Sequence, residues 1–161
     1  MDLAYRITLF HYNNSSIPET ERKKRAIEEL ESLKFDGGNG YFFAYEKRND
    51  GYYFAFHGAN PELKEKKADL EQEDAAGNKY RQELVNSAGM RNSPVEYFYK
   101  KPGSDVVIKK IGYSRAVSSW NWIIVSGIYT DEIDGQIDDQ RERFSLLLKR
   151  MVSASIIIIS L

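Results

Sequence analysis

The feature that most constrains the fold is the segment 106–133, where two β-rich runs are joined by a short polar turn and followed at once by a helix start. The run 106–113 is rich in β-branched residues, and the run 121–129 alternates aromatic and aliphatic side chains at strand spacing. Thr130 suits a helix N-cap, and the two acidic residues after it suit the positive end of a helix dipole. The segment therefore predicts two antiparallel strands that lead directly into a long C-terminal helix.

The rest of the chain adds three strands and three helices to this pair. Helical spacing of apolar residues predicts helices over 2–14, from Pro18 to Leu33, and over 78–88, while strand patterns cover 41–46, 51–57 and 95–100. Residues 60–77 are polar and poor in β-branched residues, so they predict a long loop, which in a compact domain is often functional. The sum is an α+β fold in which a five-stranded antiparallel sheet is flanked by helices.

The composition indicates a single domain, which we place at residues 1–150. A chain of 161 residues is long enough for a sizeable core. Its 23 basic and 24 acidic side chains nearly cancel, which argues against a nucleic acid as partner. The absence of cysteine excludes disulfides and thiolate chemistry, and two histidines leave little material for a zinc site.

The two ends of the sequence suggest that the chain is part of a longer protein. Residues 1–10 lack the apolar run of a signal peptide. Residues 151–161 are free of charge and strongly apolar, but shorter than the roughly 20 residues that span a bilayer. We interpret them as the start of a transmembrane helix, and the alternative is a buried terminal strand or the end of a core helix.

A series of short motifs occurs in a fixed order along nearly the whole chain. They are Gly40 to Phe43, His57 followed by NPEL at 60–63, DAAG at 74–77, Tyr97, KPG at 101–103, Lys110 with Tyr113, Trp122, and GIYTDEI at 127–133. This order resembles the single Cache sensor domains of bacterial transmembrane receptors such as methyl-accepting chemotaxis proteins. The chain departs from the family's pattern in three places. The family has proline where this chain has Gly58, glycine where it has Glu65, and a glycine-rich stretch in place of residues 91–94.

The resemblance implies a PAS-like sheet and a sensor without cofactor or catalytic activity. Such a domain lies in the periplasm, tethered to the inner membrane, binds a small molecule, commonly a short organic carboxylate, and relays the signal through its last helix to a chemoreceptor, kinase or cyclase module. It can also pair with a second copy. The positions that match the family's pocket are Tyr41, Phe43, His57, Tyr97, Lys110 and Tyr113.

The residues themselves support part of this pocket. Lys109 and Lys110 are neighbours in a strand and face opposite ways. Either one of them points inward, where a buried ammonium requires an anion, or the sheet face there is wet and both lysines are exposed to solvent. His57 ends a strand just before the long loop, and its ring faces either the covered space or a local hydrogen bond. Lys110 and Tyr113 lie on opposite sheet faces unless Gly112 marks a bulge.

Three tyrosines and one phenylalanine form same-face pairs, Tyr41 with Phe43 and Tyr97 with Tyr99. They wall a small site or belong to an ordinary core. Two other functions fit the sequence. One is a soluble PAS-like or profilin-like interaction module without ligand, and the other is a small catalytic domain with His57 as general base.

Overall fold

The computed structural model of this chain describes residues 1–90, 93–131, 137 and 140–146. The chain divides into two compact units, Met1–Tyr129 and Thr130–Leu161. The first unit contains the sheet and the helices that cover it, and it carries the candidate site.

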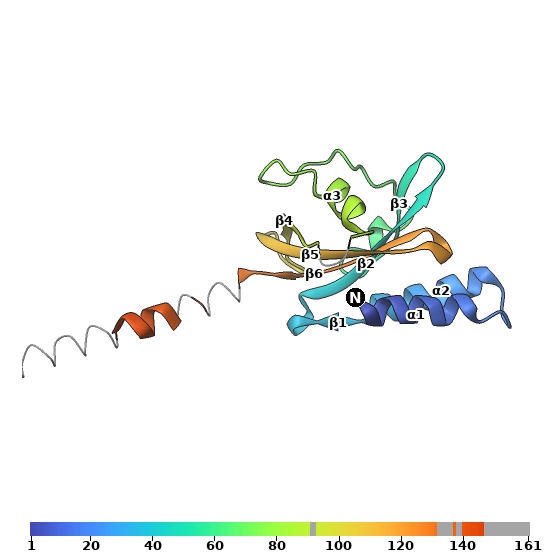
Figure 1. The fold of residues 1–161 in the computed structure, drawn as a ribbon, viewed down its shortest axis with the longest axis horizontal. Helices are drawn as coiled ribbons and strands as arrows, with labels where there is room; N and C mark the ends of the chain where they lie inside the picture. Colours follow the sequence, from blue (N-terminus) through green and yellow to red (C-terminus); the bar gives the residue numbers. More distant parts are fainter. Residues whose placement is uncertain (91–92, 132–136, 138–139, 147–161) are drawn as a thin grey trace, which may run out of the picture. The chain divides into compact units, whose positions relative to one another are not determined.

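In the described part of the chain, six strands form one antiparallel sheet (Figure 1). They are β1 (Lys34–Phe35), β2 (Gly40–Arg48), β3 (Gly51–His57), β4 (Val95–Lys100), β5 (Val107–Val117) and β6 (Trp122–Tyr129). Their order is β1-β2-β6-β5-β4, and β3 pairs with β2. The five strands expected from the sequence are all present, so the α+β antiparallel architecture is confirmed. The two-residue β1 was missed because so short a segment has no readable periodicity.

Three helices of the described residues pack on the sheet: α1 (Asp2–Asn13), α2 (Glu19–Ser32) and α3 (Tyr80–Ser87). In α1 the buried residues Ala4, Ile7, Thr8 and His11 recur every three to four positions, which is the stripe of an amphipathic helix. Figure 1 shows α1 and α2 on one side of the sheet and α3 with the long loop on the other.

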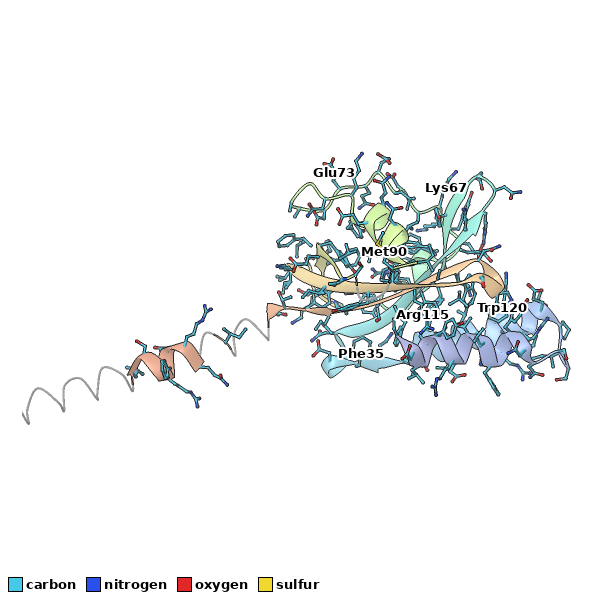
Figure 2. The ribbon with its side chains drawn as sticks, viewed as in Figure 1. Phe35, Lys67, Glu73, Met90, Arg115 and Trp120 are labelled. Carbon is cyan, nitrogen blue, oxygen red and sulfur yellow. The ribbon has the colours of Figure 1, made fainter. Side chains whose placement is uncertain are left out.

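The alternation of side chains divides the strands between two cores. Even-numbered residues of β2, such as Phe42 and Ala44, join the core beneath α1 and α2, whereas Tyr41, Phe43 and Tyr45 join the core beneath α3. Figure 2 shows Phe35 and Trp120 on the side of α1 and α2, with Lys67 and Glu73 on the side of α3. The α3 side is unusually aromatic, and the candidate site lies within it.

The long loop between β3 and α3 is fastened to the sheet at both ends. Near its start the backbone pairs with β3, where the Glu65 amide donates to the Phe54 carbonyl at 2.8 Å. Near its end the Asp74 carboxylate accepts hydrogen bonds from the amides of Ala76 and Asn78 and from the Phe98 amide of β4, each at 2.9 Å. These bonds lower the pKa of Asp74 and hold the loop over the aromatic face.

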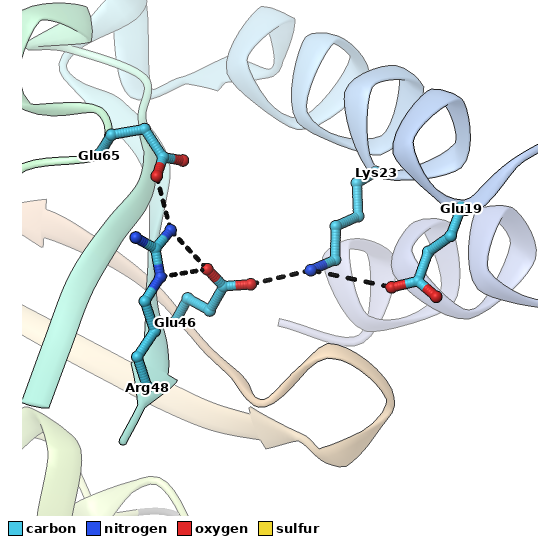
Figure 3. A network of polar contacts seen from close by, with 5 residues as sticks. All are labelled: Glu19, Lys23, Glu46, Arg48 and Glu65. Atoms are coloured by element: carbon cyan, nitrogen blue, oxygen red, sulfur yellow. Dashed lines mark hydrogen bonds and ion pairs between the residues drawn. The ribbon is translucent and has the colours of Figure 1, made fainter. Parts of the chain in front are cut away.

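Glu65 has φ = 64°, the left-handed region that favours glycine. This conformation accounts for the glycine that the resembled family carries there. In this chain Arg48 contacts the Glu65 carboxylate at 2.6 Å and also Glu46 at 2.7 Å, while Lys23 of α2 reaches Glu46 at 2.9 Å (Figure 3). The network joins α2, β2 and the loop, although partly exposed ion pairs contribute only about 0–1 kcal/mol each.

The predicted C-terminal helix falls partly outside the residues that the structure describes. Residues 131, 137 and 140–146 are helical, while 132–136, 138–139 and 147–161 lie outside the description. Among the residues described, no helix has the length and apolar character needed to cross a membrane. The predicted membrane segment at 151–161 lies outside them and stays a prediction.

Candidate functional site

A small cavity lies between the aromatic face of the sheet and α3. Side chains from β2, β3, β4 and α3 line it: Tyr41, Phe43, Tyr45, Phe54, His57, Tyr80, Arg81, Tyr97 and Tyr99. Its volume is about 10 Å³, which is room for about one water molecule. The walls are rings in mutual contact, with Tyr80 stacked on Tyr97 at a centroid distance of 4.9 Å.

Lys110 of β5 is fully buried beside this cavity, with 0% of its surface exposed. Its Nζ lies 3.7 Å from the ring centroid of Tyr41 and 4.8 Å from that of Tyr129, so the ammonium rests on two aromatic faces. Among the residues that the structure describes, Nζ has no hydrogen-bond partner. Burial lowers the pKa of Lys110 to about 7, because the charged form is poorly solvated there.

The register of the sheet explains how the lysine fits. Lys110 pairs with Tyr97 of β4 and with Tyr129 of β6, so the three side chains share the face beneath α3. Gly127 provides the space, because a Cβ there would meet the Lys110 Cε at 3.0 Å and the Ile111 carbonyl oxygen at 2.6 Å. A glycine at this position lets the lysine stem cross β6.

Lys109 lies on the other side of the sheet, where its Nζ is 2.6 Å from the Glu96 carboxylate. About 42% of the Lys109 side chain is exposed. The question that the sequence left open is thereby answered, since Lys110 is the inward lysine and Lys109 the outward one.

His57 ends β3 with its ring in the cavity wall. The ring stacks on Phe43 at 4.9 Å, and its Nδ1 accepts hydrogen bonds from the backbone amides of Ala59 at 3.3 Å and Asn60 at 3.0 Å. Burial, and then the nearby charges of Lys110 and Arg81, lower the pKa of His57 to about 3. The neutral ring therefore carries its proton on Nε2 and is a hydrogen-bond donor. A group in this state is poorly suited to act as general base, so the geometry does not favour the catalytic alternative.

Arg81 is a second buried cation at the cavity, and the sequence analysis missed it. It lies on α3 with 8% of its surface exposed, and its guanidinium is 5.4 Å from the Phe54 ring and 5.5 Å from the Tyr80 ring. A signal was present, because Arg81 precedes Leu84 by three positions and therefore falls on the apolar stripe of α3.

Five of the six predicted site residues meet at this place: Tyr41, Phe43, His57 and Tyr97 in the cavity wall, and Lys110 against Tyr41. Tyr113 does not join them. It is 43% exposed, and β5 pairs with β6 in unbroken register from Lys110 to Val117, so Tyr113 faces away from Lys110. The assignment of Tyr113 to the pocket is corrected for this reason, since the bulge at Gly112 that it required is not there.

An open groove of about 610 Å³ adjoins the cavity. Tyr80 and Tyr99 line both spaces, and the Asn60 side-chain amide donates to the Tyr99 hydroxyl at 3.2 Å. These two rings form the partition between solvent and cavity. Across the described part of the chain, no group of three or more His, Cys, Asp or Glu side chains is placed to hold a metal ion.

The sequence is similar to bacterial receptors. The chain is 30% identical to the methyl-accepting chemotaxis protein McpP of Pseudomonas putida over 128 residues, which are 78% of this chain and 22% of that protein. It is 25% identical to the sensor histidine kinase MctS of Rhizobium johnstonii over 129 residues, 78% of this chain and 26% of that protein. The chain thus spans about a quarter of the length of these curated relatives.

Solved structures share the fold. One is the periplasmic sensor domain of a chemotaxis protein, with a TM-score of 0.71 and 27% identity over 81% of this chain and 90% of that one. Another is a Cache chemosensory domain whose structure gives the basis for its carboxylic acid recognition. It has a TM-score of 0.71 and 25% identity, over 81% of this chain and 88% of that one. The family model dCache_2, described as Cache domain, matches residues 1–134. The resemblance seen in the sequence is confirmed, and this chain belongs to the Cache domain family.

Proposed function

We propose that this chain is the extracytoplasmic sensor domain of a transmembrane signalling receptor and that it binds a short organic carboxylate at the aromatic cavity. The observation that carries the proposal is the Lys110 ammonium, which is fully buried and has no hydrogen-bond partner among the described residues. A buried charge without a counter-ion costs several kcal/mol, and its contacts with aromatic faces offset only part of that cost. A carboxylate beside Nζ supplies the missing counter-ion.

The side chains of the cavity wall indicate the chemical character of the ligand beyond its carboxylate. Aromatic rings surround it, so they suit a short aliphatic chain next to the carboxylate. The cavity has room for about one water molecule, whereas acetate has four non-hydrogen atoms, so we expect binding to move Tyr80 and Tyr99, or the whole of α3, outward. Binding is therefore coupled to a displacement on one face of the sheet.

The relatives support the receptor context. McpP is a methyl-accepting chemotaxis protein and MctS a sensor histidine kinase, and a solved neighbour is a periplasmic sensor domain. Carboxylic acid recognition is known for another neighbour, which is 25% identical to this chain. These similarities favour a periplasmic binding domain over an interaction module without ligand.

A thermal-shift screen tests the proposal, because a ligand that binds only the folded state raises the melting temperature. Acetate, propionate, pyruvate and lactate are compared with amino acids and amines. Lys110→Ala is expected to abolish the shift, whereas its neighbour Lys109→Ala is the matched control and keeps it. If amines alone raise the melting temperature, or if Lys109→Ala is the variant that loses binding, the carboxylate assignment is wrong.

We further propose that residues 1–150 form the sensor, that residues 151–161 begin a membrane helix, and that the helix after Thr130 links the two. Residues 137 and 140–146 are helical, which supports this continuity. In a full-length receptor, insertion of two glycines between Gln140 and Arg141 is expected to uncouple the response while ligand affinity stays normal. Unchanged signalling would show that the helix is only a tether.

A further inference from the structure

The aromatic cavity and the groove beside it are separated by side chains. The cavity has a volume of about 10 Å³, and the groove one of about 610 Å³. Among the described residues, the two spaces share Tyr80 and Tyr99 in their lining. A small molecule in the groove is therefore kept out of the cavity by these two rings.

Two other sides of the cavity are closed by backbone hydrogen bonds. On one side, β2, β6, β5 and β4 pair with one another in the sheet. On another side, next to the cavity residue Phe54, the long loop is tied to β3. The Phe54 amide donates to the Lys66 carbonyl at 3.0 Å, and the Ala68 amide donates to the Tyr52 carbonyl at 2.7 Å. Opening the cavity on either side would break several backbone bonds together.

The two rings of the partition are held with different strength. Tyr80 is buried and stacks on Tyr97, with 4.9 Å between the ring centroids and 10° between the ring planes. Tyr99 is only partly buried, and the ring nearest to it, that of Tyr80, lies 6.1 Å away by centroid. Close ring stacking therefore fixes Tyr80, whereas Tyr99 is the ring that moves more easily.

A hydrogen bond from Asn60 keeps the Tyr99 ring in the partition. The Asn60 Nδ2 atom donates to the Tyr99 hydroxyl at 3.2 Å. The backbone of Asn60 is itself anchored, because its amide donates to the His57 Nδ1 atom at 3.0 Å. A hydrogen bond between two neutral side chains contributes little net stability. Breaking this bond therefore frees Tyr99 to turn towards the groove at small cost.

We propose that Tyr99 is the gate between the groove and the cavity, and that Asn60 is the latch that holds the gate closed. This inference rests on the proposed function, because it takes a short carboxylate as the molecule that passes. Tyr99 opens for passage and closes again behind the acid, while the displacement of α3 provides the room that the bound acid needs. Asn60 is a positioning residue, since it touches Tyr99 and His57 rather than the acid.

A latch that forms in the free and in the bound protein alters the rates of entry and exit by the same factor and leaves the affinity unchanged. Stopped-flow tyrosine fluorescence measures both rates with acetate, propionate, pyruvate and lactate, each mixed separately with the protein. Asn60→Ala should raise the association and dissociation rate constants alike, by about fivefold, which is the factor that an ordinary hydrogen bond is worth. The dissociation constant should stay within about twofold of wild type.

A double-mutant cycle ties this effect to the bond between the two side chains. Tyr99→Phe removes the other end of the bond and should also accelerate entry and exit. Either substitution alone breaks the bond, so the double variant should be no faster than the faster single variant. Tyr53→Phe is the matched control, because the Tyr53 hydroxyl donates to Asp50 at an exposed position, and it should keep the wild-type rates. If Asn60→Ala does not fold, the rates of Tyr99→Phe decide.

A second measurement tests the gate without any carboxylate. The pKa of Lys110 is about 7, so its amine is largely neutral at about pH 8. In cyanate solution a neutral amine attacks the carbon of isocyanic acid and passes a proton to the nitrogen of the reagent, which leaves a urea on the lysine. Peptide mass spectrometry should show this reaction at Lys110 about fivefold faster in Asn60→Ala than in wild type. The exposed Lys24 is the internal reference and should react equally in both proteins.

Three results would overturn the inference. The first is wild-type rates of binding in Asn60→Ala, and the second is a change in only one of the two rates, which would mean that the latch residue acts on the bound state. The third is a double variant that combines the full effects of both single variants. An equal rate of Lys110 modification in wild type and Asn60→Ala would also refute the gate. A protein that binds none of the four acids would refute the proposed function, while the reaction of Lys110 would still decide on the gate.

Discussion

Replacing the buried lysine by an apolar residue of similar shape should stabilise the ligand-free domain. Lys110→Met keeps a long unbranched side chain in the space above Gly127 and removes the ammonium that rests on Tyr41. The alanine variant is different, because it also loses the packing of the stem, so its stability changes little. Methionine therefore isolates the electrostatic cost of the lysine.

The magnitude follows from the pKa. The pKa of Lys110 falls from 10.5 in its ordinary environment to about 7 in the folded protein. In the window between these values the unfolded chain binds the proton and the folded chain does not, so the stability of the wild-type protein rises with pH there. At pH 6 the penalty is about 5 kcal/mol, and at pH 9 about 2 kcal/mol remains. Subtracting up to about 2 kcal/mol for the lost cation–π contacts leaves a net gain of roughly 3 kcal/mol at pH 6.

Urea unfolding followed by tryptophan fluorescence measures this difference at pH 6 and pH 9. The advantage of Lys110→Met over wild type should shrink by about 3 kcal/mol between the two values. Lys109→Met serves as the control and should stay within about 0.5 kcal/mol of wild type at both, because Lys109 is exposed. A Lys110→Met protein that is less stable than wild type, or whose advantage does not vary with pH, would refute the reasoning.

Three further perturbations probe the structure around the site. Gly127→Ala places a Cβ 2.6 Å from the Ile111 carbonyl oxygen and should lower the free energy of unfolding by about 2 kcal/mol or more. The control is Gly89→Ala, which has open space around it and should leave the free energy of unfolding in urea nearly unchanged. The pKa of His57 is lowered to about 3, so the domain should lose up to about 5 kcal/mol of stability as the pH falls from 6.5 towards 3. In an acid titration, His57→Gln should lose much less stability than wild type. A loss as steep as in wild type would mean that another group titrates. Asp74→Ala removes the acceptor of the Phe98 amide and should destabilise the domain by about 2 kcal/mol, with faster hydrogen exchange at that amide; unchanged exchange would show that the loop is held elsewhere.

Much of the fold could be predicted from the sequence, because each long strand or helix has a local pattern of apolar residues. The alternating runs became β5 and β6, and the turn at Asn49 and Asp50 became the connection between β2 and β3. The helices followed from apolar residues at intervals of three and four. Features that depend on contacts distant in sequence were not accessible, such as the pairing of β2 with β6.

The site residues likewise divide into those that local patterns predict and those that depend on contacts between distant segments. Alternation states that Lys109 and Lys110 face opposite ways, but only the register with Tyr97 and Tyr129 decides which of them is buried. Tyr113 was assigned by resemblance although alternation places it on the other face, and here the local rule was the better guide. Arg81 was overlooked because a charged residue on a short helix is usually solvated, and its burial depends on the aromatic face beneath α3.

The most direct test of the central claim is a crystal structure of the domain with a bound short carboxylate. We expect a carboxylate oxygen within about 2.7–3.2 Å of the Lys110 Nζ, inside the ring of aromatic side chains from β2, β3 and β4, with α3 displaced outward. A ligand bound instead in the groove beside Lys100 and Asp105, or a Lys110 that stays without a partner while the ligand occupies the cavity, would contradict it.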